Sequence, residues 1–146
     1  MPLILTRASC SKRSPALKAA IARWRSFPVW CHRFPPHLSV VNTDSLAEQI
    51  QRALPETFVV KSLNTVNAAV MIEPSRVPGP HTVFVSGNDK AAKGRVMDFL
   101  RTLGWHSIID LGDITSARAA EQILPLWVRL YGVLGTADFN IAVMKP

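Results

Sequence analysis

The sequence predicts an α/β fold in which helices cover a central sheet. Residues 82–112 form the clearest unit, in which a β-branched run, an amphipathic helical stretch and a second apolar run follow with short connections. A helix of this length between two strands indicates a parallel crossover. Because another buried strand is predicted at residues 57–63, we expect a three-layer sandwich with a mostly parallel sheet.

Size and composition indicate one globular domain in a reducing compartment. The chain has 146 residues, of which 48% are hydrophobic, and this is enough to bury a core. Its apolar runs are too short to span a bilayer, so we expect no membrane partner and a cytoplasmic location. The two cysteines, Cys10 and Cys31, match neither a disulfide framework nor a zinc-site spacing, and we predict no metal ligands.

Charge divides the chain into a tail and a body. The formal net charge of +7 arises within the first 43 residues, which contain basic residues and no acid, whereas acids and bases balance in the remainder. We expect residues 1–34 to be a basic, poorly structured or helical tail and residues 35–146 to be the body. The tail could be genuine, frameshifted or a targeting segment. Its basic and aromatic residues could contact nucleic acid, but we favour a solvated tail.

Capping signals place the helices of the body. Ser45 and Glu48 form a capping box, and Pro55 ends that helix. A short helix is expected to begin within residues 64–67, and the Asn64 side chain is expected to cap it, to contact a ligand, or to do both. Asn88 is predicted to cap the next helix, which Gly104 terminates.

The last helical region is unusually apolar. It covers residues 113–134, is capped by Asp113 and is interrupted at Pro125, and we expect Arg118 and Glu121 to form an ion pair within it. Its second part, Leu124–Leu134, is apolar on nearly every side, which indicates deep burial or a homo-oligomer interface. Residues 139–143 are predicted to form a terminal strand.

The sequence lacks the loop that usually binds a dinucleotide. No glycine occurs before Gly79, so the first half contains no Gly-x-Gly-x-x-Gly or Walker loop. Such glycines allow the pyrophosphate to approach the backbone. The chain therefore reads as the second half of a nucleotide-dependent fold whose glycine-loop half is missing.

Six blocks in the body form a distinctive series. They lie, in order, at residues 60–65 (VKSLNT), 83–89 (VFVSGND), 109–112 (IDLG), 116–118 (SAR), 124–126 (LPL) and 139–141 (FNI). This series resembles the carboxyl half of the deazaflavin-dependent NADP oxidoreductases, and it is similar to the reductase domain of the six-transmembrane metalloreductases. The resemblance covers about three quarters of the chain, and it implies a partial Rossmann-like fold.

The resemblance also implies a function and a site. Asn64 and Thr65 would lie where the nicotinamide of NADP meets the second substrate, and Leu126 and Phe139 would wall an apolar pocket for a deazaflavin or flavin-like acceptor. Hydride transfer between two stacked rings requires that the protein align the rings and exclude water, and it does not require an acid–base pair. We identify no catalytic residue. Two interpretations stay open: a truncated NADP-dependent oxidoreductase, active or inactive as this chain, and a non-catalytic dimerising module.

Overall fold

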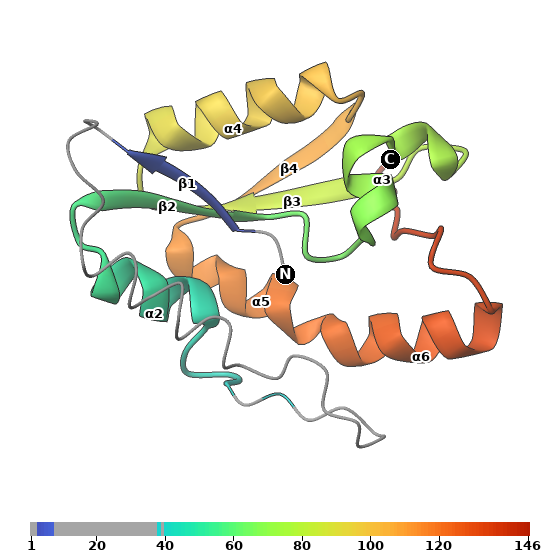
Figure 1. Ribbon diagram of the computed structural model, residues 1–146, viewed down its shortest axis with the longest axis horizontal. Coiled ribbons are helices and arrows are strands. Elements are labelled where there is room, and N and C mark those ends of the chain that lie inside the picture. Colours follow the sequence, from blue (N-terminus) through green and yellow to red (C-terminus); the bar gives the residue numbers. More distant parts are fainter. Residues whose placement is uncertain (1–2, 8–37, 39) are drawn as a thin grey trace.

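The computed structural model describes residues 3–7, 38 and 40–146 as a mixed sheet between two layers of helices. The sheet has the order β1-β2-β3-β4. The strands span Leu3–Arg7 (β1), Thr57–Ser62 (β2), Thr82–Ser86 (β3) and Ser107–Gly112 (β4). Helix α4 (Lys90–Thr102) covers one face, and α2 (Leu46–Ala53), α5 (Ala117–Gln122) and α6 (Leu124–Leu134) lie on the other (Figure 1). The expected α/β class is confirmed.

The sheet is mixed rather than mostly parallel. Strand β2 runs antiparallel to both β1 and β3, whereas β3 and β4 are parallel as predicted for the strand–helix–strand unit. After β2 the chain passes through α3 (Ala68–Ile72) and a 3₁₀ turn (Pro74–Arg76), then returns along the sheet as β3. Because this connection does not cross the sheet as α4 does, it cannot make a parallel pair. The expectation of a mostly parallel sheet is not confirmed.

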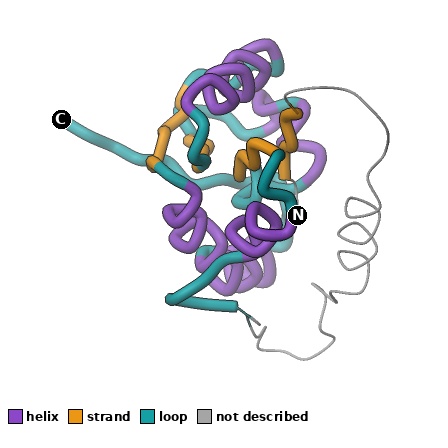
Figure 2. Tube along the Cα trace, turned by 90° about the vertical axis from the view of Figure 1, so that its left-hand side faces the viewer, coloured by secondary structure: helices purple, strands orange, loops and turns teal. Residues whose placement is uncertain are grey.

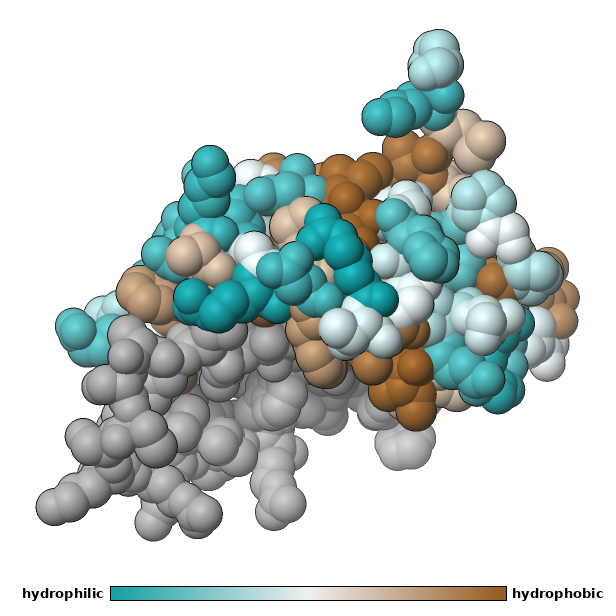
Figure 3. Space-filling model, turned by 90° about the horizontal axis from the view of Figure 1, so that it is seen from above, coloured by the Kyte–Doolittle hydropathy of each residue, from teal (hydrophilic) through white to brown (hydrophobic). Residues whose placement is uncertain are grey.

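Two apolar clusters join the layers on either side of the strands. The cluster under α4 joins strand residues to helix residues, among them Val60, Val85, Val96 and Leu100. A smaller cluster, Ala47, Val59, Ile114 and Ala117, joins β2 to α2 and α5. The end-on view shows the strands between these helical layers (Figure 2). From the α4 side, polar side chains cover much of the visible surface (Figure 3).

The carboxyl ends of β3 and β4 are tied together closely. Gly87 donates its backbone N–H to the Gly112 carbonyl at 3.1 Å. A Cβ atom at Gly87 would lie 2.9 Å from the Val59 carbonyl oxygen, so this glycine allows β3 to approach β2. Asp89, rather than Asn88, caps α4 by accepting from the Ala92 N–H at 2.6 Å. The cap predicted at Asn88 is therefore wrong by one residue. Asn88 accepts from the Ile114 N–H instead.

The segment predicted as a terminal strand runs beside β3 without regular strand structure. Ile141 accepts from the Thr82 N–H at 2.9 Å, and Asn140 Nδ2 donates to the Thr82 carbonyl at 2.9 Å. Within the expected tail, β1 is described and residues 8–34 lie outside the described residues. None of the helices in the described residues is long and apolar enough to cross a lipid bilayer.

Candidate functional site

A left-handed residue shapes the loop at the carboxyl end of β2. Val59 belongs to the cluster on the α2–α5 side and Val60 to the cluster under α4, as expected for the alternation of a strand. Continued alternation would place Leu63 on the α5 side, but Leu63 has φ of 60° and packs in the cluster under α4. Left-handed backbone costs a leucine roughly 1–2 kcal/mol. Strain of this kind concentrates at functional sites.

Asn64 is directed toward α5 by this reversal. Its Nδ2 donates to the Ala120 carbonyl at 2.6 Å, and its Oδ1 has no hydrogen-bond partner among the described residues. The expected capping role is wrong, because Asn67 caps α3 by accepting from the Val70 N–H at 2.9 Å. Asn64 therefore has a fixed amide with an acceptor oxygen still available.

Thr65 adds a second polar group to the same loop. Thr65 is 2% exposed, and its Oγ1 is buried without a hydrogen-bond partner in the described part of the chain. An unpaired buried hydroxyl costs about 1–3 kcal/mol, so most such groups in native proteins have a partner. The loop thus combines backbone strain at Leu63 with unmet hydrogen-bonding capacity at Thr65.

The two predicted pocket walls both lie at α6, because Leu126 belongs to that helix and Phe139 packs against it. Phe139 stacks on Trp127 with ring centroids 5.2 Å apart, and Trp127 stacks in turn on Tyr131 at 5.8 Å. Leu126 is 54% exposed on α6. Neither of the two cavities described below is lined by Leu126 or Phe139. The proposed acceptor pocket therefore stays a prediction, whereas the aromatic row of Trp127, Tyr131 and Phe139 is a feature of the described structure.

Two ion pairs beside the loop differ from the pair predicted. Arg118 does not pair with Glu121; it donates to both carboxylate oxygens of Glu48, at 2.8 and 2.6 Å. Glu121 instead lies 3.0 Å from Lys61 Nζ, and this pair is buried, with side-chain exposures of 9% and 2%. Burial lowers the pKa of Lys61, and the nearby Glu121 carboxylate opposes that effect. Pairing across 60 residues leaves no local signal in the sequence.

The Glu48–Arg118 pair predicts acid sensitivity. Hydrogen bonds from Arg118 lower the pKa of Glu48 below its ordinary value of 4.5. A depressed carboxyl pKa stabilises the fold above the unfolded value, and this contribution is lost as pH falls through the lower folded value. In urea titrations between about pH 6 and pH 3, we therefore expect Glu48→Gln to lose less stability on acidification than the wild type. Parallel acid profiles for the two proteins would contradict this assignment.

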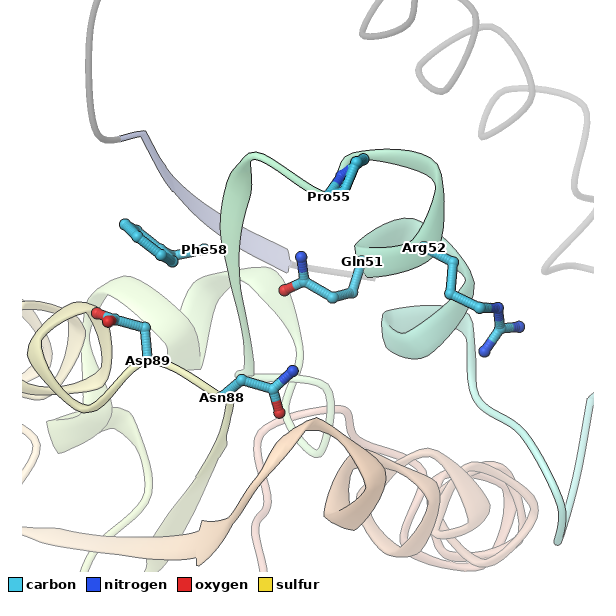
Figure 4. Close-up of a pocket in the computed structure, with 6 residues that line it drawn as sticks. All are labelled: Gln51, Arg52, Pro55, Phe58, Asn88 and Asp89. Carbon is cyan, nitrogen blue, oxygen red and sulfur yellow. The ribbon is translucent and has the colours of Figure 1, made fainter.

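The larger cavity lies at the other end of β2 from Asn64. Its volume is about 470 Å³, and it is lined by Gln51, Arg52, Pro55, Phe58, Asn88 and Asp89 (Figure 4). Gln51 is held by the Thr57 carbonyl and the Val59 N–H, and Arg52 points away toward Asp44. Since these polar groups already support local structure, we do not identify this cavity as the site.

A second cavity, of about 380 Å³, lies where β3 and β4 begin. It is lined by Pro74, Gly79, Pro80, His81, Gly104, Trp105, His106 and Ser107. His81 is engaged at both ring nitrogens, by the Pro74 carbonyl and by Asn140 Nδ2, each at 3.0 Å. In the described part of the chain, no three His, Cys, Asp or Glu side chains are arranged to hold a metal ion.

Asp113 caps a 3₁₀ turn through the Thr115 N–H, as predicted.

Comparisons with known proteins identify relatives of this chain. No family model matches it. It is 35% identical over 97 residues to the F420-dependent NADP reductase of Methanocaldococcus jannaschii, a match that covers 66% of this chain and 40% of the reductase. A candidate F420-dependent NADP reductase from Arthrobacter sp. FB24, known from its crystal structure, is 57% identical in sequence to this chain. The two structures match with a TM-score of 0.76 over 80% of this chain and 53% of that one.

The match is partial on the side of the relatives. The chain spans about two fifths to one half of the length of the proteins it matches. The similarity to six-transmembrane metalloreductases stays a prediction. The resemblance drawn from the sequence blocks is confirmed: the chain is related to the F420-dependent NADP reductases.

Proposed function

We propose that residues 35–146 form the carboxyl, acceptor-facing half of a Rossmann-like domain of an NADP-dependent oxidoreductase. In this proposal the domain serves hydride transfer between nicotinamide and a deazaflavin or flavin-like acceptor in the cytoplasm. The observation that carries it is the loop after β2, where Leu63 is left-handed and the buried Thr65 hydroxyl is unpaired. The relatives bear names that specify F420 and NADP, which supports the same class of ligands.

The loop residues fit a polar ligand group. Asn64 Oδ1 would accept from a donor such as the carboxamide of nicotinamide, and Thr65 Oγ1 would gain the partner that it lacks. The bound rings supply the hydride chemistry, and the protein contributes alignment and exclusion of water. Leu126 and Phe139 would border the acceptor once it is bound, with Trp127 stacked behind Phe139.

The phosphates of the dinucleotide would need other residues. Gly87 is explained by its close approach to the Val59 carbonyl, and the first 78 residues contain no glycine. We therefore expect this chain to bind the nicotinamide end of NADPH weakly and to gain little from the pyrophosphate. Similar affinities for NADPH and reduced nicotinamide mononucleotide, measured by tryptophan fluorescence, would support this division, whereas tight binding of NADPH alone would contradict it.

Asn64→Ala tests the ligand contact directly. Loss of one hydrogen bond of about 1–1.5 kcal/mol should raise the Kd for reduced nicotinamide mononucleotide roughly tenfold. Asn88→Ala is the matched control, because Asn88 also makes one backbone hydrogen bond but lies at the opposite end of the sheet. If both variants bind as the wild type does, Asn64 is not a ligand contact.

A homo-oligomer through α6 is a second part of the proposal. None of the eleven residues of α6 is buried by the described part of the chain, and Val133 is 82% exposed. Leu126, Tyr131 and Leu134 are also exposed on this helix. A second copy that packs α6 against α6 would remove these apolar surfaces from water. This arrangement would also serve a non-catalytic dimerising module.

Sedimentation velocity over a range of concentrations tests this assembly. We expect the wild type to associate and Val133→Glu to shift it toward the monomer, because a carboxylate would have to be desolvated in the interface. Ile72→Glu on α3 is the control, since Ile72 is also a highly exposed apolar residue, 70% exposed, and lies outside α6. A wild type that stays monomeric at high concentration would exclude the α6 interface.

A further inference from the structure

The buried Lys61–Glu121 pair connects the same two segments as the Asn64 amide. Lys61 lies on β2, three residues before Asn64, and Glu121 follows Ala120, whose carbonyl accepts from Asn64 Nδ2. The two contacts are short, 3.0 Å for the ion pair and 2.6 Å for the amide. The end of β2 is therefore fixed to α5 at two neighbouring points.

Glu121 is itself held in place from a third element. Its Oε2 accepts from the Leu46 N–H at 2.8 Å and its Oε1 from the Ala47 N–H at 3.2 Å, both in the first turn of α2. A carboxylate at a helix amino terminus satisfies orphan N–H groups and is favoured by the helix dipole. Glu121 thus anchors α5 between α2 and β2, and Lys61 completes its hydrogen bonding.

Stability alone does not explain an ion pair at this position. A buried ion pair is commonly no more stabilising than apolar side chains of similar volume, because both charges must be desolvated. A pair of this kind does fix geometry, since its donors and acceptors meet in one arrangement. Here the geometry that it fixes includes the distance between Asn64 and the Ala120 carbonyl.

We infer that Lys61 and Glu121 are positioning residues that orient the Asn64 amide for its ligand. The Ala120 carbonyl takes the Nδ2 side of the amide, so Oδ1 faces away from α5 as an acceptor. The loop would then select a ligand group that donates an N–H or O–H. This inference rests on the proposed function, in which the loop at residues 63–65 contacts the nicotinamide end of the ligand.

Lys61→Met tests the inference, with Lys93→Met as its matched control. Lys93 is also largely buried, and its Nζ lies 2.8 Å from Asp110 Oδ1 on β4, which is not paired with β2. Both variants remove a lysine from an ion pair, and both should lose stability. Only Lys61→Met should shift the side-chain amide resonance of Asn64 and speed hydrogen exchange in residues 63–65, both measured by NMR in the full chain.

Ligand binding gives an independent readout. We expect Lys61→Met to raise the Kd for reduced nicotinamide mononucleotide by up to about tenfold, and Asn64→Ala to add little when it is combined with Lys61→Met. If the wild type does not bind this ligand, the proposed function fails, but the NMR comparison still decides the positioning role. If Lys61→Met does not fold, Glu121→Gln gives the same two readouts.

The inference is overturned if the Asn64 resonance and the loop exchange are the same in Lys61→Met and Lys93→Met. It is also overturned if the effects of Lys61→Met and Asn64→Ala on the Kd are fully additive, because independent residues do not couple. A general loosening of the fold would change exchange in residues 63–65 and around β4 in both variants, and the control variant separates this outcome from a local effect.

Discussion

Glu121→Ala is expected to destabilise the chain by about 3–5 kcal/mol, the cost of removing one partner of a buried ion pair. The substitution leaves the Lys61 ammonium without its counter-ion and the Leu46 and Ala47 N–H groups without their acceptor. Urea unfolding followed by circular dichroism measures the change. Asp98→Ala is the control, because the Asp98–Arg101 pair is exposed and should contribute less than about 1 kcal/mol.

The cost of Glu121→Ala should depend on pH in a defined direction. Burial already lowers the pKa of Lys61, and removing the carboxylate lowers it further. Between the folded and the unfolded pKa of Lys61, the unfolded chain binds a proton that the folded chain has released, so stability rises with pH in this window. The variant should therefore recover part of its loss as pH rises from neutral toward 10.5, the ordinary lysine value. If Glu121→Ala lowers the free energy of unfolding as little as Asp98→Ala does, the Lys61–Glu121 pair is not buried as described.

Local patterns in the sequence predicted most of the elements. The strand at residues 82–86 matches β3, and the capping box at Ser45 precedes α2 as expected. These features depend on residues a few positions apart, such as a β-branched run or a serine three positions before a glutamate. Pro125 likewise lies in the first turn of α6, where a proline is tolerated.

The features that define the candidate site depend on distant residues. Leucine rarely adopts a left-handed backbone, so nothing in the sequence announces the φ of 60° at Leu63. The predicted Arg118–Glu121 pair is wrong, because the spacing of two residues on a helix does not show that α2 and β2 lie beside α5 and offer each of them another partner. The antiparallel pairing of β2 with β3 was also not predictable from local patterns. It depends on the path of the connection between the two strands, which is set by tertiary contacts.

Trp105→Ala is expected to cost about 3–5 kcal/mol, the range measured for removing a large aromatic side chain from a core. Trp105 is 1% exposed, packs in the cluster under α4 and donates its Nε1–H to the Met71 carbonyl at 3.1 Å. Its backbone N–H also bonds the Leu100 carbonyl at 3.1 Å, which with Gly104 closes α4 in a Schellman motif.

The same substitution should loosen the region that follows the candidate loop, because Met71 belongs to α3. We expect faster hydrogen exchange in residues 68–72 of Trp105→Ala, at denaturant concentrations where the rest of the sheet is still protected. Phe99→Ala is the control, since Phe99 lies on α4, close to Trp105 in the sequence, but is 53% exposed and should change stability by about 0.5 kcal/mol or less. If the two variants unfold at the same urea concentration, Trp105 does not anchor α3 to the core, and the support of the loop must come from the α5 side alone.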